Sequence, residues 1–164
     1  MTQSYQHLLD QRRLRDALGD FATGVTVVTA RGADGQPVGV TINSFASVSL
    51  DPPLVLWSLG LESPSLAAFE SCSHYVVNVL AADQIDFSQR FSQTQSDRFA
   101  GIDFQIGVGG TPVLPGCCAR FECRNEMRYP GGDHLILVGY VESFHREEKP
   151  PLIFHGGRYR ALIG

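Results

Sequence analysis

The amino-acid sequence predicts a mainly β protein, a mostly antiparallel barrel with a few helices. Six or more stretches have the length and the apolar or alternating pattern of β-strands. Tight-turn signals at Asp34–Gly35 and Gly156–Gly157 separate neighbouring stretches, which is typical of hairpins. The helical segments are few and do not alternate regularly with the strands. An antiparallel barrel is therefore favoured over a sheet built from βαβ units.

The first third of the chain is predicted to contain one helix and three strands. Apolar residues recur at helical spacing over residues 10–22, and Gly24 is expected to stop this amphipathic helix. The strands are expected at residues 25–30, 38–42 and 54–59. Because the last of these is largely apolar and unbroken, it is predicted to be buried on both faces.

The rest of the chain is predicted to contain two short helices and further strands. Ser63 is expected to cap the first helix with Pro64 as its first residue, and Asp83 to cap a second helix over residues 83–92. Arg and Glu alternate at the even positions from 120 to 128, which predicts a strand with one charged, solvated face. Further strands are expected at residues 75–80 and 135–144, and a hairpin at residues 151–162.

Length and composition indicate a single globular domain over residues 1–164. Of the 164 residues, 43% are hydrophobic and 18% are charged. The formal net charge of −4 argues against binding to nucleic acid or to an acidic membrane. The longest apolar runs are too short to span a bilayer, and the N-terminus lacks the apolar core of a signal peptide. A cytoplasmic location is therefore expected.

The sequence lacks the motifs of several enzyme and metal-binding classes. Its four cysteines form no CxxC pair, fit a reducing compartment and, without an HExxH motif, indicate no metal site. The glycines at residues 107–112 lack the spacing of a dinucleotide-binding loop, and there is no Walker motif or GxSxG elbow. No residue is therefore assigned as a catalytic nucleophile, acid or base.

The stretch "GVTINSFASVSLDPPL", residues 39–54, is unusually rich in small uncharged hydrogen-bonding side chains. Thr41, Asn43 and Ser44 could hydrogen-bond the edge of a ring system that carries both donors and acceptors. Ser47 and Ser49, together with Ser63 and Ser65 at a helix start, could hold a phosphate, because a helix N-terminus attracts anions without a lysine. The alternative is that these hydroxyls only cap helices and satisfy turns.

A second candidate site is "GGDHLILVG", residues 131–139. Its glycines permit a tight turn, and Asp133 could orient His134 at the mouth of a strand. A histidine in that place could donate a hydrogen bond to a flat cofactor or stack on it. The alternative is an ordinary turn aspartate beside a histidine at a strand edge. Arg90, Arg98 and Phe99, in the polar stretch near the second helix, could cover a phosphate or belong to a surface loop.

Several segments together resemble the flavin reductase domain family, the split-barrel reductases typified by the small components of two-component aromatic monooxygenases. The segments are "FATGVTVVTARGADGQPVGVTINSFASVSLDPPLVLWSL", "SPSLAAFESCSHYVVNVL", "GGDHLILVGYVES" and "PLIFHGGRYRAL", which occur in the family's order. The similarity covers residues 14–162, nearly the whole chain. It implies a homodimeric, six-stranded, Greek-key split β-barrel that binds FMN or FAD.

The resemblance also implies roles for individual residues. In the family, one segment lies along the isoalloxazine ring, and here it matches Thr41, Ile42, Asn43 and Ser44. Segments that approach the ribityl chain and phosphate match Ser47, Val48, Ser49, Ser58, Leu59, Ser63 and Ser65. The motif associated with nicotinamide binding matches Gly132, Asp133 and His134. All three residues of that motif are present, which favours a pyridine-nucleotide-dependent enzyme.

The activity implied is that of an NAD(P)H:flavin oxidoreductase. Reduced nicotinamide, from NADH or NADPH, would pass hydride to the flavin, while the protein supplies orientation and electrostatics rather than acid or base groups. The reduced flavin would then serve a separate monooxygenase component. Two alternatives stay open at this point: a flavoprotein that keeps FMN as a fixed prosthetic group, and a flavin carrier without hydride transfer.

Overall fold

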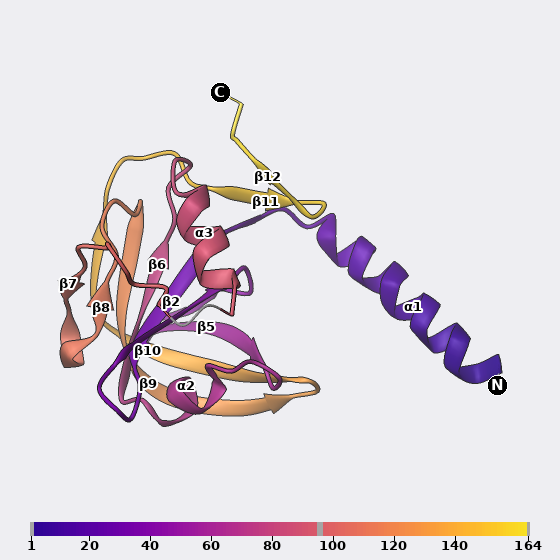
Figure 1. Ribbon diagram of the computed structural model, residues 1–164, viewed down its shortest axis with the longest axis horizontal. Helices are drawn as coiled ribbons and strands as arrows, with labels where there is room; N and C mark the ends of the chain where they lie inside the picture. The colour runs from indigo at the N-terminus through magenta and orange to yellow at the C-terminus, as the bar shows by residue number, and fades with distance from the viewer. Residues whose placement is uncertain (1, 95–96, 164) are drawn as a thin grey trace.

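The computed structural model describes residues 2–94 and 97–163 (Figure 1). Most of the strands form one antiparallel sheet in the order β3-β2-β6-β9-β10-β5-β4. The mainly β, antiparallel architecture with few helices was predicted and is confirmed. The strands of this seven-stranded sheet are β2 (Thr26–Arg31), β3 (Pro37–Ile42), β4 (Ala46–Leu50), β5 (Pro53–Gly60), β6 (His74–Val79), β9 (Ala119–Gly131) and β10 (His134–Arg146).

Shorter elements surround this sheet. A three-stranded sheet joins β1 (Thr23–Gly24), β11 (Ile153–His155) and β12 (Arg158–Arg160), and β7 (Gln105–Ile106) pairs with β8 (Pro112–Val113). The helices are α1 (Thr2–Gly19), α2 (Leu66–Ser71), α3 (Ile85–Ser92) and the 3-10 turn η1 (Val108–Gly110). Within the described chain, no helix has both the length and the apolar character that a membrane crossing requires.

Hairpins of the sheet form where turn residues were predicted. β2 and β3 pair from Thr26↔Ile42 to Arg31↔Pro37 around a turn that contains Gly35, whose φ of +78° suits glycine. The hairpin of β11 and β12 likewise turns at Gly156 and Gly157, both with positive φ. These two predictions are confirmed because the turn chemistry is local in sequence.

Both predicted helix caps are wrong. α2 begins at Leu66 with Ser65 as N-cap, because Ser63 is used in the preceding turn, where its carbonyl accepts from the N–H of Leu66. α3 begins at Ile85 with Gln84 as N-cap, instead of Asp83. The Gln84 side chain accepts from the N–H of Ala81 at 2.9 Å, which ties the helix start to the end of the preceding strand.

The main core lies on one face of the sheet, around Trp57. Its ring makes edge contacts with Phe69 at 5.0 Å and with Tyr75 at 5.6 Å between centroids. A second core includes Phe91 of α3, packed on Phe99 at 5.0 Å. β2 contributes to both cores, because its successive side chains point to opposite faces.

β5 is not buried on both faces, contrary to the prediction. Val55, Trp57 and Leu59 are buried, while the residues that alternate with them are only half buried. The apolar run therefore has one face in the core and one face at the surface of the chain. In the sheet, β5 pairs on one side with β4, which forms a free edge.

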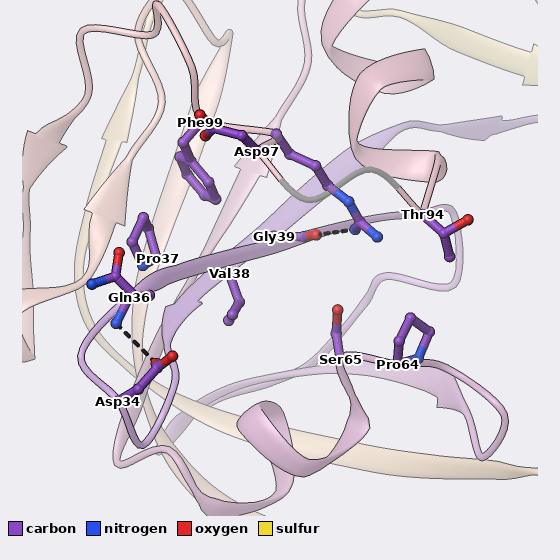
Figure 2. Close-up of a pocket in the computed structure, with 11 residues that line it drawn as sticks. Asp34, Gln36, Pro37, Val38, Gly39, Pro64, Ser65, Thr94, Asp97 and Phe99 are labelled. Atoms are coloured by element: carbon purple, nitrogen blue, oxygen red, sulfur yellow. Dashed lines mark hydrogen bonds between the residues drawn. The ribbon is translucent and has the colours of Figure 1, made fainter.

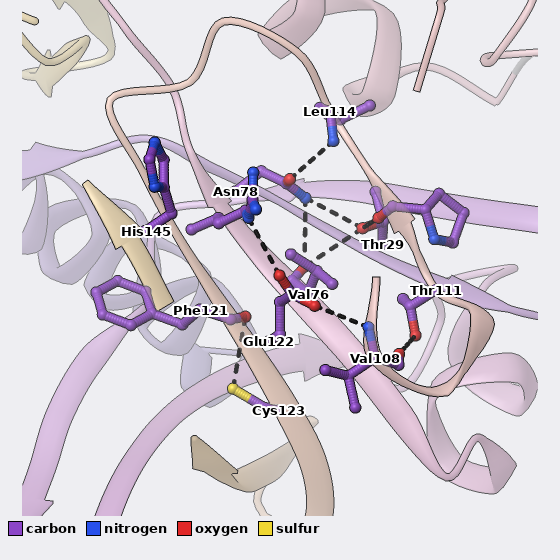
Figure 3. Close-up of polar contacts among 12 residues, drawn as sticks. Thr29, Val76, Asn78, Val108, Thr111, Leu114, Phe121, Glu122, Cys123 and His145 are labelled. Atoms are coloured by element: carbon purple, nitrogen blue, oxygen red, sulfur yellow. Dashed lines mark hydrogen bonds and ion pairs between the residues drawn. The ribbon is translucent and has the colours of Figure 1, made fainter. Parts of the chain in front are cut away.

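The charged face of β9 is only partly solvated, because Glu122 is buried. Its Oε2 accepts from the N–H of Val108 at 2.7 Å, and its Oε1 accepts from Nε of Arg120 at 3.1 Å (Figure 3). The η1 turn covers this carboxylate, a tertiary contact that the alternation of Arg and Glu could not reveal. The three other even positions, Arg124, Glu126 and Arg128, are exposed as predicted.

The predicted N-terminal helix exists but projects from the rest of the protein (Figure 1). It ends at Gly19 rather than near Gly24, and the N–H of Gly156 donates to the Gly19 carbonyl at 2.9 Å. Its apolar side chains are not covered: Leu14 is 60% exposed and Leu18 is 66% exposed. The pattern therefore predicted that a helix exists, but not its bounds, which are Thr2–Gly19 instead of residues 10–22, or its surroundings.

A buried polar network centred on Asn78 connects β6 to its neighbours (Figure 3). Asn78 Nδ2 donates to the Val27 carbonyl at 2.9 Å and to Thr29 Oγ1 at 3.1 Å, and its Oδ1 accepts from the N–H of Leu114 at 3.0 Å. Asn78 is fully buried, so each of these partners would be costly to leave unpaired.

Replacing Asn78 by alanine is expected to lower the free energy of unfolding by about 2–3 kcal/mol, because buried N–H and C=O groups lose their partners. Chemical denaturation of the two proteins measures the difference. Asn43→Ala makes the same chemical change at an exposed site and is expected to alter stability by less than about 0.5 kcal/mol. Equal losses for the two variants would contradict the role of the network.

Candidate functional site

Strand β3 borders two hollows in the protein surface. The first, which we call the Arg98 cleft, has a volume of about 580 Å³ and is lined by Gly39, Ser65 and Arg98 among others (Figure 2). The second, the Thr41 cavity, has a volume of about 310 Å³ and includes Thr41 and Asn43 in its lining. Gly39 and Thr41 are two residues apart, which places the hollows about 7 Å apart along one strand.

The Arg98 cleft contains one well-anchored cation. Arg98 donates from one terminal nitrogen to the carbonyls of Gly39 at 2.7 Å and Phe91 at 3.3 Å. Burial lowers the pKa of Arg98, but a guanidinium remains charged in proteins. Its other N–H groups are the natural partners of a phosphate. Ser65, at the start of α2, lines the opposite side of the same cleft (Figure 2).

The Thr41 cavity is lined by uncharged residues only. Its apolar surface comes from Val25, Ile42 and Phe154. Its polar groups belong to Thr41, Asn43, Ser88, Ser92 and Tyr159. Three elements meet here: β3, α3 and the β11–β12 hairpin. Hydrogen bonds hold them together, from Thr41 Oγ1 to the Ser88 carbonyl at 2.7 Å and between Ser88 Oγ and Tyr159 Oη at 2.7 Å.

The two hollows together fit a ligand with an uncharged ring and an anionic tail. The cavity offers apolar walls with a few hydroxyl and amide groups, as expected for a planar heterocycle. The cleft offers a guanidinium and a serine hydroxyl, which can hold a phosphate, and its lining also includes the carboxylates of Asp34 and Asp97. A flavin mononucleotide has both parts joined by a short polyhydroxyl chain, so the residues present fit this group.

Several predicted site residues have their polar groups engaged within the chain. Ser44 Oγ accepts from the N–H of Ser58 at 2.9 Å and donates to its carbonyl at 3.0 Å, which ties the loop after β3 to β5. Ser63 Oγ accepts from the N–H of Ser65 at 3.3 Å. Leu59 lies in the main core, so only its backbone could reach a ligand.

Three predicted residues lie away from the linings of both hollows. Ser47, Val48 and Ser49 belong to β4, which pairs only with β5 and forms a free edge of the sheet. Ser47 and Val48 are exposed and Ser49 is half buried. Within a single chain, the structure therefore brings Thr41, Ile42 and Asn43 together in one hollow and Ser65 into the other, but not the β4 residues.

The Gly-Asp-His motif forms the turn between β9 and β10. Gly132 has a φ of +65°, and Asp133 Oδ1 lies 2.7 Å from Nδ1 of His134. This hydrogen bond, and the charge of the imidazole, lower the pKa of Asp133. The Asp133 carbonyl accepts from the N–H of Leu61 at 2.9 Å, which places the turn beside the segment that leads to Ser65.

The sequence pattern did not assign three residues that the structure places at the site. Gly39 permits close packing, since a Cβ there would lie 2.7 Å from ring atoms of Phe91; a glycine inside a strand is a recognisable signal of such an approach. For Arg98 the sequence left two alternatives open, covering a phosphate or belonging to a surface loop, because its partner carbonyl on Gly39 is distant in sequence. Tyr159 carried no local signal at all.

Burial keeps two of the four cysteines as neutral thiols. Burial raises the pKa of Cys117 and of Cys123 to about 12, so both thiols are protonated at neutral pH. In the part of the chain that the structure describes, no group of three or more His, Cys, Asp or Glu side chains is placed to hold a metal ion.

Comparisons with known proteins show the family of the chain. Residues 18–162 match the flavin reductase like domain family. The chain is 48% identical to the FMN reductase (NADH) SmoA of Agrobacterium fabrum, over 92% of this chain and 85% of that protein. It is 44% identical to the reductase subunit HsaB of a flavin-dependent monooxygenase from Rhodococcus jostii, over 94% of this chain and 79% of that protein.

A solved structure shows the same fold. The NADH:FAD oxidoreductase SgcE6 of Streptomyces globisporus C-1027, in complex with NAD and FAD fragments, superposes with a TM-score of 0.89. It shares 38% sequence identity, and the match covers 94% of this chain and 93% of that one. On this evidence, and with the family match over most of its length, the chain belongs to the flavin reductase like domain family.

Proposed function

We propose that the protein is an NAD(P)H:flavin oxidoreductase that reduces FMN or FAD and supplies the reduced flavin to a separate monooxygenase component. The observation that carries this proposal is the pair of hollows along β3, one uncharged and one containing Arg98. NADH is the favoured donor, because the names of SmoA and SgcE6 both specify it. The monooxygenase partner is favoured by the similarity to the HsaB reductase subunit.

The protein's own residues would bind and orient the reactants. A bound flavin supplies the chemistry, since its ring accepts hydride from a reduced nicotinamide. Thr41 and Asn43 would hold the ring edge, with Ile42 packing beside it, and Arg98 and Ser65 would hold the phosphate. Backbone N–H groups near Asn43 and Ser44 would stabilise the negative charge of the reduced ring. No acid or base side chain is required, which agrees with the lack of an assigned catalytic residue.

The Gly-Asp-His turn would bind the nicotinamide. Since Nδ1 of His134 is held by the Asp133 carboxylate, Nε2 is the ring nitrogen left to contact a ligand. Nε2 lies 3.9 Å from the position that a Cβ on Gly60 would take, so the imidazole stands over the end of β5. Gly132, by its positive φ, allows the turn that brings Asp133 and His134 to this place.

The single domain of residues 1–164 is proposed to be a six-stranded Greek-key split barrel, located in the cytoplasm. Six strands contribute to one apolar core: β2, β3, β5, β6, β9 and β10. β3 and β4 are the two outer strands of the sheet, yet only residues 43–45 separate them in sequence. The sheet must therefore curl until its two edges approach each other, which is what a barrel requires.

The functional unit is proposed to be a homodimer. A helix with a solvent-exposed apolar stripe is only marginally stable alone, and α1 exposes Leu14, Leu18 and the adjoining Phe21, the last by 79%. The free edge β4 exposes Val48 and Leu50, the latter by 95%. Because α1 projects away from its own sheet (Figure 1), these two apolar surfaces can cover each other only between two copies.

In this arrangement, the remaining predicted flavin contacts would lie at the subunit interface. Ser47, Val48 and Ser49 line neither hollow of their own chain, so they would reach the flavin held by the second copy. Ser58, Leu59 and Ser63 follow on β5 and the loop after it, between this interface and the Arg98 cleft. Ser63 Oγ accepts from the N–H of Ser65, and that bond does not use its O–H, which we propose donates to the ribityl chain.

His134→Ala is expected to raise the KM for NADH or to slow flavin reduction by about 10-fold, the effect of losing one good hydrogen bond. Flavin affinity should change by less than about 2-fold, because His134 lines neither hollow. Steady-state NADH oxidation and a flavin titration measure the two effects. His145→Ala, at the far end of the same strand, is the matched control, and equal kinetics for both variants would remove His134 from the site.

Arg98→Met is expected to weaken FMN binding by about 10- to 100-fold, because a charge-assisted contact to phosphate is lost. Riboflavin, which has no phosphate, should bind the variant within about 2-fold of the unmodified protein. Arg90→Met serves as the control, since Arg90 is anchored nearby on the Ala100 carbonyl but does not line the cleft. A parallel loss for FMN and riboflavin would contradict the assignment of Arg98 to the phosphate.

The double variant Leu14→Gln/Leu18→Gln is expected to shift the protein from dimer to monomer at micromolar concentration, because the apolar stripe of α1 no longer needs cover. Light scattering coupled to gel filtration gives the molar mass directly. Arg12→Gln/Arg13→Gln changes the same helix outside the apolar stripe and should leave the mass unchanged. A monomeric unmodified protein would refute the homodimer.

A further inference from the structure

The hydroxyl groups around the Thr41 cavity have fixed donor directions. Thr41 Oγ1 donates its hydrogen to the Ser88 carbonyl at 2.7 Å, and Ser92 Oγ donates to the Gln89 carbonyl at 2.7 Å. A hydroxyl has one hydrogen and two lone pairs. With the hydrogen already directed at α3, each of these oxygens can offer a ligand only an acceptor.

The other polar groups of the cavity supply donors. Ser88 Oγ and Tyr159 Oη lie 2.7 Å apart, and whichever donates to the other, one O–H of the pair is not used in that bond. Asn43 is exposed, and its amide can both donate and accept. The cavity therefore combines acceptor-only oxygens with separate donors, so it favours a ring edge that presents both an N–H and carbonyl oxygens.

Thr41 is the most rigidly held of the acceptors. It lies in β3 opposite Val27 of β2, and its hydroxyl is bound to the backbone of Ser88, whose side chain is buried. Tyr159 fixes Ser88 from the other side, so β3, α3 and the β11–β12 hairpin support one another around this oxygen. Ser92, in contrast, is an exposed residue at the end of α3.

We infer that Thr41 Oγ1 accepts a hydrogen bond from N3–H of the flavin, so that the Thr41 cavity recognises the imide edge of the ring. This inference rests on the proposed flavin reductase function. The pyrimidine edge of a flavin presents a carbonyl, an N–H and a second carbonyl, and the N–H is its single donor. An acceptor-only oxygen can satisfy just that position, while the Asn43 amide and the Ser88–Tyr159 pair are available to the carbonyls.

The inference is tested with FMN and its N3-methyl derivative, which lacks the donor but keeps the ring and the phosphate. Quenching of flavin fluorescence gives the dissociation constant of each ligand. The unmodified protein is expected to bind FMN about 5- to 10-fold more tightly than N3-methyl-FMN, the effect of one hydrogen bond. In Thr41→Val, which keeps the shape of the side chain, this preference should fall below about 2-fold.

Two further variants control the comparison. Thr41→Ser retains the hydroxyl and should retain the preference for FMN. Thr26→Val removes a hydroxyl that donates to the Ile42 carbonyl at 3.2 Å, in the strand paired with β3 but outside the cavity, and should also retain it. Because each variant is judged by the ratio of two dissociation constants, a general loss of stability or of flavin affinity cancels.

The outcomes separate this inference from the function on which it rests. If the unmodified protein reduces FMN with NADH but binds both ligands equally, or if Thr41→Val keeps the preference, the role of Thr41 is wrong and the reductase function stands. If the unmodified protein neither binds nor reduces flavin, both are overturned. If the preference for FMN over N3-methyl-FMN is lost in Thr41→Val and kept in the two control variants, the hydrogen bond between Thr41 Oγ1 and N3–H is established.

Discussion

The antiparallel pairing of β2 with β3 determines how the β3 residues of the proposed flavin site face. Its register, with Thr29 opposite Gly39 and Val27 opposite Thr41, directs Gly39 and Thr41 toward α3. Val38 and Val40 then point into the main core. Because strand side chains alternate, a slip by one residue would exchange the two faces and turn positions 39 and 41 away from α3. The fold and the site thus depend on the same register.

Hydrogen-bond partners distinguish the hydroxyls that maintain the fold from those that can contact a ligand. Ser44 both donates to and accepts from the backbone of Ser58, so its role in joining β3 to β5 is structural. Thr41 donates to α3 and also lines the Thr41 cavity, so we propose that its oxygen accepts from a ligand there. Both residues belong to the same hydroxyl-rich stretch. Ser44 fits the turn-forming interpretation of that stretch, and the ligand-binding interpretation is proposed for Thr41.

Local sequence patterns predicted the hairpins and the mainly β architecture well, because turn glycines and alternation act over a few residues. They failed where a distant segment decides the outcome: η1 buries Glu122, and carbonyls from β3 and α3 anchor Arg98. The cap of α2 was missed because the preceding turn uses Ser63. Similarity to a known family, rather than periodicity, indicated the flavin. Only the coordinates show the two hollows along β3, which we propose hold its ring and its phosphate.

The most direct test of the proposed activity is anaerobic mixing of the purified protein with NADH or NADPH and a substoichiometric amount of FMN, FAD or riboflavin, followed by the loss of flavin absorbance. Rapid bleaching of FMN or FAD, with one nucleotide preferred as donor, is the predicted result. Measurable flavin binding without bleaching would contradict it, and would leave the protein as a flavin carrier or as a flavoprotein that does not use nicotinamide.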